Sequence, residues 1–214
     1  MNVNDLEYKK LPADWKRREH FEFFKNYDEP FFGITVNVDC TRAYKRAKRD
    51  SVSFFLFYLH RALEAANMVE AFRYRLVDQE AVVYNKVNVS VTIGREDNTF
   101  GFTFIQYDED FEVFARDAER KIEKARRTSG LMLEEASKSA ALIQCSALPW
   151  FSFTSFSHAR NYSTDDSVPK ICFGRMFEEG EKKKMPVSVH VHHALADGYH
   201  VGRYFEKLQD LLNK

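Results

Sequence analysis

The sequence predicts one domain of the α/β class, an α+β two-layer sandwich in which helices cover a mixed, mostly antiparallel β-sheet. Helical and strand patterns are interspersed along all 214 residues. The central strand patterns follow one another directly instead of alternating regularly with helices, which argues against a Rossmann fold. No glycine-rich phosphate loop is present. Glycine (8) and proline (5) are scarce, and no linker or repeat divides the chain, so residues 1–214 are expected to form a single domain.

In the N-terminal half, the first helix is expected to begin with Asp14 as its N-cap and to carry Phe21 and Phe24 on one face. A short basic helix and then a mostly buried helix, capped by Ser51 or Ser53, are expected farther along. These two helices span residues 41–49 and 53–66. Alternating apolar residues and β-branched or aromatic runs predict strands over residues 31–38, 72–77, 81–84, 87–93 and 99–107.

In the C-terminal half, an apolar stripe with charges opposite predicts an amphipathic helix over residues 110–127. Strands are expected over residues 141–146, 150–156, 170–177 and 182–192. The run Glu179-Gly180-Glu181 is typical of a hairpin turn. Apolar residues at helical spacing predict a last helix over residues 198–213.

Composition excludes several classes of protein. Lys and Arg together number 32, as do Asp and Glu, so the net charge is zero, which argues against a protein that coats nucleic acid or an acidic membrane. No apolar run approaches the ~18 residues of a membrane span, and the N-terminus has no signal-peptide core. Cys40, Cys145 and Cys172 show no metal-ligand spacing. We therefore expect a cytoplasmic protein with reduced thiols, no bound metal, and neither a membrane nor a nucleic acid as partner.

Four of the seven histidines lie between His190 and His200, around the end of the strand over residues 182–192. A metal site would need a third ligand, and neither H-E-x-x-H nor a cysteine partner is present. Histidines satisfied by hydrogen bonds at a strand edge, with Asp197 as a helix cap, are the structural alternative. A general base at the strand end is the functional one, because imidazole titrates near neutral pH.

The stretch from His192 to Gly198 fits H-H-x-x-x-D-G, which resembles the active-site motif of the coenzyme-A-dependent acyltransferases. Residues 15–24, 146–156 and 192–208 are similar, in order and in spacing, to the three signatures of the chloramphenicol acetyltransferases. The resemblance covers essentially the whole chain. It implies the fold of that family and a direct transfer of acetyl from acetyl-CoA, a co-substrate rather than a tightly bound cofactor, to the 3-hydroxyl of chloramphenicol, which would give antibiotic resistance.

Residue by residue, the resemblance implies that His193 is the general base and that Ser146 hydrogen-bonds the oxyanion. Asp197 and Arg17 match a salt bridge that orients His193. Cys145, beside Ser146, is not the expected nucleophile because the family forms no acyl-enzyme. A non-catalytic binding protein on the same scaffold is disfavoured because all four catalytic positions are intact.

The resemblance also implies a binding site for each substrate. The acceptor pocket would include Phe23, Phe24, Phe100, Phe156, His158 and Cys172. The coenzyme site would include Trp150, Arg175 and Met176. The run of lysines over residues 182–184 is interpreted as a solvated strand edge, with a phosphate grip as the alternative.

Members of the family are homotrimers with active sites at the subunit interfaces, so a homotrimer is implied here. His158 stands where the family commonly has a leucine, and Phe24 where it has a tyrosine. The alternative function is therefore a coenzyme-A-dependent O-acyltransferase of the same fold that acts on another hydroxyl acceptor.

Overall fold

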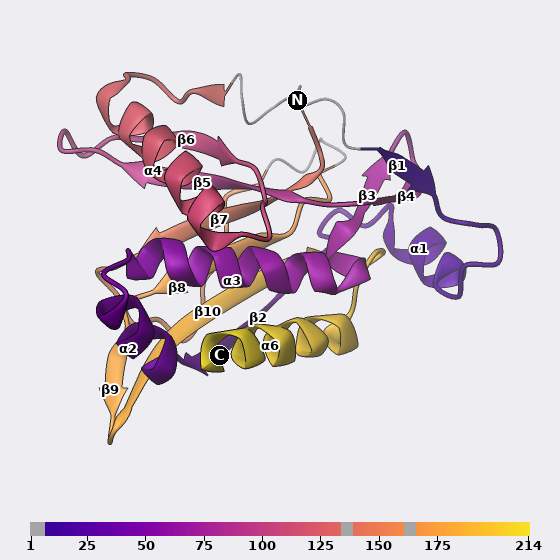
Figure 1. The fold of residues 1–214 in the computed structure, drawn as a ribbon. Helices are drawn as coiled ribbons and strands as arrows, with labels where there is room; N and C mark the ends of the chain where they lie inside the picture. Colours follow the sequence, from indigo (N-terminus) through magenta and orange to yellow (C-terminus); the bar gives the residue numbers. More distant parts are fainter. Residues whose placement is uncertain (1–6, 134–138, 161–165) are drawn as a thin grey trace.

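A mixed β-sheet of seven strands forms the centre of the protein, and a three-stranded sheet lies at one end of it (Figure 1). The computed structural model describes residues 7–133, 139–160 and 166–214. The numbers of strands in the two sheets refer to these residues. The main sheet has the order β2 (Phe31–Asp39), β10 (Lys182–His192), β8 (Lys170–Gly174), β7 (Leu142–Leu148), β5 (Asn88–Gly94) and β6 (Phe100–Ile105), and β9 (Phe177–Glu179) pairs with β10. The small sheet has the order β1 (Tyr8–Lys10), β4 (Glu80–Tyr84) and β3 (Tyr74–Val77).

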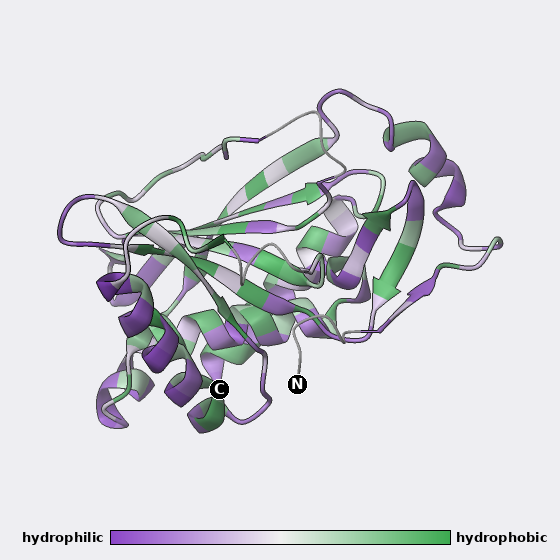
Figure 2. Cartoon of the chain, turned by 90° about the horizontal axis from the view of Figure 1, so that it is seen from above, coloured by the Kyte–Doolittle hydropathy of each residue, from purple (hydrophilic) through white to green (hydrophobic). Residues whose placement is uncertain are grey.

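The pairing within the main sheet confirms the expected mixed, mostly antiparallel type. Strand β7 runs parallel to both of its neighbours, β5 and β8, whereas the other pairs are antiparallel. Hydrophobic and hydrophilic residues alternate along the strands (Figure 2), so each strand presents an apolar side to the core and a more polar side to the opposite face. Ser146 lies on this polar face, and so do its register neighbours Cys172 and Ser188.

Three long helices cover the apolar face of the main sheet: α3 (Phe54–Met68), α4 (Phe111–Arg127) and α6 (Gly198–Asn213) (Figure 1). A side chain caps each of them. Ser53 accepts a hydrogen bond from the Leu56 amide and Asp197 caps α6, both as expected, and Asp110 caps α4, which was not predicted. Helix α2 (Thr41–Arg49) has the predicted bounds. None of the helices in the described part of the chain is both long enough and apolar enough to cross a bilayer.

Two local predictions in the N-terminal half are wrong. Asp14 does not start a helix: the chain turns twice after Pro12, and α1 spans Arg18–Phe24 with no side-chain cap. The first residues of the strand expected over 72–77 form a 3-10 helix (Glu70–Arg73), because Phe72 stacks 4.5 Å from the Tyr204 ring of α6. β3 and β4 then leave the main sheet altogether.

Residues 150–156 are irregular rather than a strand. This segment packs over Gly174, where an added Cβ would lie 2.9 Å from the Phe153 ring. The Phe151 carbonyl accepts a hydrogen bond from the Arg175 amide at 2.6 Å. The aromatic residues that suggested a strand therefore belong to a segment that packs on the polar face of the sheet, and this segment does not pair with a strand.

Arg75 joins the small sheet to the main one. The side chain is fully buried, and it donates to the carbonyls of Phe72 (2.9 Å), Tyr74 (2.5 Å), Ala140 (2.7 Å) and Leu142. Burial lowers the pKa of the guanidinium to about 9, so the side chain keeps its charge at neutral pH. One side chain thus connects β3 to the strand that carries Ser146.

Replacing Arg75 with methionine is expected to lower the free energy of unfolding by about 3 kcal/mol, because buried carbonyls lose their donor and nothing replaces it. Urea unfolding followed by circular dichroism measures the change. Arg120→Met is the control, since the Arg120 side chain is 70% exposed on α4. An equal, small change in both variants would contradict a joining role for Arg75.

Candidate active site

The turn between β10 and α6 carries His193 and Asp197, and Arg17 holds both. Arg17 forms an ion pair with the Asp197 carboxylate through one guanidinium nitrogen, and the other donates to the His193 carbonyl at 3.1 Å. The His193 amide donates to the Pro30 carbonyl at 2.7 Å. The structure therefore brings together the predicted Arg17, Asp197 and His193, and it fixes the backbone of the turn from two other segments of the chain.

Asp197 is also the cap of α6. Its carboxylate accepts a hydrogen bond from the Tyr199 amide at 3.0 Å and lies 2.7 Å from Nδ1 of His200. Burial alone would raise the pKa of Asp197, but His200 and Arg17 together lower it below the usual value. The carboxylate is thus charged at neutral pH. Sequence reasoning did not assign His200, whose position three residues after the cap is the one signal that could have found it.

Aromatic rings surround the imidazole of His193. The Phe24 ring stacks on it at 4.1 Å and 13°, and the Phe32 ring lies 4.8 Å away. Phe23 and Tyr27 pack on Phe24 at 4.9 and 5.1 Å, and Phe23 is 61% exposed. Phe32 and Tyr27 were not predicted as site residues.

The two nitrogens of this imidazole are in different situations. Nδ1 of His193 is buried and has no hydrogen-bond partner within the described residues. Nε2 is therefore the nitrogen available to a substrate hydroxyl. The stacked ring of Phe24 fixes the plane of the imidazole, as a general base requires.

Ser146 lies on β7, and its hydroxyl is 3.1 Å from the hydroxyl of Thr92 on β5. A serine hydroxyl held in this way can donate a hydrogen bond to a developing oxyanion. Thr92 was missed because only the parallel pairing of β5 with β7 brings it to Ser146. Cys145 faces the core, where burial raises the pKa of its thiol. A buried, protonated thiol is a poor nucleophile.

His193 and Ser146 lie far apart within one chain. Ser146 is in register with Cys172, which is in register with Ser188 of β10. From Ser188 the strand continues for four residues to His192, or ~13 Å, and two strand spacings add ~10 Å across the sheet. The backbone positions of Ser146 and His192 are therefore roughly 16 Å apart, and His193 follows His192 directly, so the two side chains are too far apart to act on one substrate atom.

The predicted acceptor residues divide in the same way. Phe23 and Phe24 accompany His193, whereas the others lie on the polar face with Ser146. There, the His158 ring is 4.7 Å from the Phe156 ring and 5.1 Å from that of His190, and burial lowers the pKa of His158 to about 4.

The other two members of the second group lie near Ser146 in the pairing of the strands. Phe100 is half-exposed at the start of β6, on the same face as Thr92. Cys172 is fully buried, and burial raises the pKa of its thiol to about 12. One chain therefore holds two half-sites, one around His193 and one around Ser146.

A cavity of about 220 Å³ lies between the start of α3 and the ends of β7 and β8. Its walls are mostly apolar, and they include Ala147, the residue that follows Ser146, and Phe54 at the start of α3. The predicted coenzyme residues Arg175 and Met176 line it. Trp150 does not line it but is next to Pro149, which does, and Trp150 is 65% exposed. The apolar walls suit a long, flexible and largely uncharged arm.

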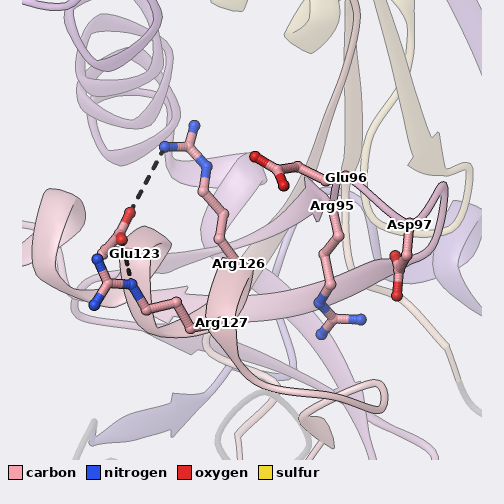
Figure 3. A pocket seen from close by; sticks show the side chains of 7 residues that line it. Arg95, Glu96, Asp97, Glu123, Arg126 and Arg127 are labelled. Atoms are coloured by element: carbon pink, nitrogen blue, oxygen red, sulfur yellow. Dashed lines mark ion pairs between the residues drawn. The ribbon is translucent and has the colours of Figure 1, made fainter.

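A larger cavity of about 750 Å³ lies between the β5–β6 turn and the end of α4, and it contains no predicted site residue (Figure 3). Glu123 lies between Arg127 and Arg126, at 2.6 and 4.0 Å. Arg95 donates to the Ala125 and Gly130 carbonyls at 2.9 and 2.7 Å. The guanidinium therefore connects the β5–β6 turn to the end of α4 and the residues that follow it. Across the ranges that the structure describes, no group of three or more His, Cys, Asp or Glu side chains could hold a metal ion.

Comparison with known proteins places this geometry in a family. The sequence profile described as chloramphenicol acetyltransferase matches residues 3–209. Chloramphenicol acetyltransferase 3 of Escherichia coli is 30% identical over 214 residues, which cover 100% of this chain and 98% of that protein. A chloramphenicol acetyltransferase of Proteus mirabilis is 29% identical over 92% of this chain and 90% of its own length.

The fold agrees with solved structures. One chloramphenicol acetyltransferase superposes with a TM-score of 0.88 at 31% identity, covering 96% of this chain and all of that one. A probable dihydrolipoamide acetyltransferase of Listeria monocytogenes shares the fold, with a TM-score of 0.69 at 13% identity over 95% of this chain and 94% of that one. The chain therefore belongs to the chloramphenicol acetyltransferase family of acyltransferases.

Proposed function

We propose that this protein transfers the acetyl group of acetyl-CoA to the 3-hydroxyl of chloramphenicol and so inactivates the antibiotic. The observation that carries the proposal is the family match along residues 3–209, with both half-sites intact inside it. His193 and its clamp of Arg17 and Asp197 form one half, and Ser146 with Thr92 forms the other.

The reaction follows from these groups. Nε2 of His193 takes the proton of the 3-hydroxyl while the oxygen attacks the thioester carbonyl carbon. The carbonyl oxygen becomes negative and accepts a hydrogen bond from Ser146. When the tetrahedral intermediate collapses, the carbon–sulfur bond breaks, and the coenzyme thiolate takes the proton from the imidazolium. No acyl-enzyme forms, and Arg17 and Asp197 position the base without touching the substrate.

The complete site requires a second copy of the chain, and we propose a homotrimer with three shared sites. The separation of roughly 16 Å between the backbone positions of Ser146 and His192, the residue before His193, supports this assembly, since each half-site alone lacks either a base or an oxyanion donor. The exposed rings of Phe23 and Tyr27, beside His193, would be covered by the neighbouring subunit. A closed ring of head-to-tail interfaces brings the His193 side of one subunit to the Ser146 side of the next.

Acetyl-CoA acts here as a co-substrate, and no tightly bound cofactor is needed. The mostly apolar cavity that Arg175 and Met176 line supports a coenzyme site at the ends of β7 and β8. We expect the protein to work in the cytoplasm, where acetyl-CoA is made and thiols stay reduced. The three cysteines, all free and buried, fit that compartment.

The proposed function is tested with purified protein, acetyl-CoA and millimolar chloramphenicol, by following thiol release together with the mass of the product. We expect thiol release that depends on both substrates and a singly acetylated drug. Expression in a chloramphenicol-sensitive bacterial host should then raise the concentration of drug that stops growth. Absence of acetylated drug at millimolar chloramphenicol, with correctly folded protein, would rule out this acceptor.

A second acceptor class is supported by the contact between His158 and His190. These two imidazoles place polar groups on the Ser146 face, and Nε2 of His158 is buried without a partner among the residues described. A hydroxyl acceptor with an additional polar group would satisfy that nitrogen. Good expression without resistance, together with turnover of another alcohol, would favour this alternative.

A further inference from the structure

A group of basic side chains lies on the polar face of the main sheet, two residues along the strands from Ser146. Lys170 of β8 is in register with His190 of β10. Lys170 precedes Cys172, the register partner of Ser146, by two residues, so the side chains of all three lie on one face of the sheet. The backbone positions of Lys170 and Ser146 are therefore roughly 8 Å apart.

The irregular segment that follows β7 and packs on this face contributes two more basic side chains. The guanidinium of Arg160 lies 4.3 Å from the centre of the Phe31 ring, and the ammonium of Lys170 lies 5.0 Å from the same centre. The ring of His158 lies 5.1 Å from that of His190. Two cations and two imidazoles are thus gathered beside Ser146, and we call them the basic cluster: His158, Arg160, Lys170 and His190.

The carboxylates that pair with the two cations are more exposed than the cations themselves. Asp166 pairs with Lys170 at 2.5 Å, and Glu29 pairs with Arg160. The side chains of Lys170 and Arg160 are only 5% and 11% exposed, whereas those of Asp166 and Glu29 are 26% and 53% exposed. Each carboxylate can therefore turn toward water at little cost, while the cations stay inside the protein and need an anion there.

The two imidazoles experience the positive charge around them. Burial lowers the pKa of His158 to about 4, and His190 and Lys170 contribute to the decrease. Burial also lowers the pKa of His190, and the charges of Arg160 and Lys170 contribute. Nε2 of His158 is buried and has no hydrogen-bond partner among the described residues. A local positive potential and an unpartnered nitrogen both favour a ligand with a negatively charged group.

We propose that the basic cluster binds a carboxylate of the acceptor, so that the protein also acetylates hydroxyl compounds that carry a carboxylate roughly 8 Å from the hydroxyl. Arginine and lysine donate charge-assisted hydrogen bonds to carboxylates, which are stronger than those between neutral groups. The inference rests on the proposed acetyl transfer and adds a class of acceptor to it. The reaction is unchanged: the hydroxyl oxygen attacks the thioester carbon, and its proton passes through His193 to the coenzyme thiolate. The carboxylate only positions the acceptor.

The test compares two acceptors of nearly equal shape that differ in charge, para-(hydroxymethyl)benzoate and the neutral para-(hydroxymethyl)benzamide, with chloramphenicol as a further neutral acceptor. Thiol release from acetyl-CoA and the mass of the product are measured for the full-length protein. We expect kcat/KM to be about tenfold higher for the benzoate than for the benzamide, as one charge-assisted contact would give. The difference should arise mainly from a lower KM for the benzoate, because the carboxylate binds equally in the ground state and the transition state.

Two variants test the cluster separately, Lys170→Met on β8 and Arg160→Met on the irregular segment. Each should reduce the preference for the benzoate about tenfold, and the benzamide reports on folding and chemistry in the same preparation. If Lys170→Met fails to fold, as circular dichroism would show, Arg160→Met decides. The control is Lys121→Met, since Lys121 on α4 pairs with Asp117 at 2.8 Å and at the same sequence spacing as Lys170 and Asp166. It should keep the preference of the wild type.

The outcomes separate this inference from the proposed function. If the wild type acetylates chloramphenicol but does not favour the benzoate over the benzamide, the carboxylate site is overturned and the proposed function stands. A preference that persists in both variants, or that falls equally in the Lys121 control, would also overturn it. If the wild type acetylates none of the three alcohols, the proposed function itself fails.

Discussion

Replacing His193 with alanine is expected to lower kcat for acetyl transfer by about 10²–10⁴-fold, the usual contribution of a positioned general base. The imidazole lies between the rings of Phe24 and Phe32, and its backbone is held by Arg17 and Pro30. Tyr27 also packs on the Phe24 ring, but a phenol is almost fully protonated at neutral pH and cannot replace the imidazole as the base. Steady-state kinetics with saturating acetyl-CoA measure the loss.

The affinity for coenzyme A should stay the same in this variant, because the proposed coenzyme cavity is lined by residues of α3, β7 and β8 and not by His193. His193→Gln keeps much of the volume of the ring and guards against a packing effect, and it should be as inactive as the alanine variant. His20→Ala, an exposed histidine on α1, is the matched control and should retain full activity. A His193→Ala enzyme with near-normal kcat would refute the role of this residue.

Replacing Ser146 with alanine is expected to lower kcat by about 10²–10³-fold with little change in KM, because the hydroxyl stabilises charge that exists only in the transition state. We do not expect Thr92 to take its place, because the Thr92 hydroxyl lies 3.1 Å from that of Ser146 and is anchored on the neighbouring strand β5. Gln144→Ala, two residues earlier on the same strand face, is the control. If Ser146→Ala instead raised KM alone, Ser146 would contribute to ground-state binding and not to the oxyanion.

The two variants together test whether the site is shared. His193→Ala subunits keep an intact Ser146 half-site, and Ser146→Ala subunits keep an intact His193 half-site. If the chains are refolded as an equal mixture and assemble at random, about a quarter of the interfaces should combine two intact halves and recover activity. Separately assembled variants, mixed afterwards, are the control. Absence of recovery in co-refolded oligomers would contradict a site shared between subunits.

Local signals predicted most of the elements but not their partners. Helix α2 has the bounds expected from sequence, and Ser53 and Asp197 cap helices as expected, because capping and periodicity act over a few residues. The irregular course of residues 150–156 depends on Gly174, about twenty residues away along the chain, and no local pattern reveals it.

The residues of the candidate site likewise fall into those that a local sequence motif predicted and those that only the fold brings together. The H-H-x-x-x-D-G motif identified His193 and Asp197 because these residues are close in sequence. Thr92 and Phe32 lie near Ser146 and His193 only through strand pairing and side-chain packing, so the sequence offered no signal for them. The separation of His193 from Ser146 likewise follows from the register of β10, β8 and β7, which composition and periodicity do not determine.

Arg75 donates hydrogen bonds to the carbonyls of Ala140 and Leu142, which are 65 and 67 residues away along the chain. Tyr74 is next to Arg75, and its ring lies 5.4 Å from the ring of Trp15. Trp15 is two residues before Arg17 in the chain. Opening the small sheet would therefore leave a buried cation without acceptors and loosen the segment that holds the turn with His193. Local opening at β3 is accordingly expected to be costly, and its amide hydrogens should exchange with solvent at the pace of the most protected strands of the main sheet.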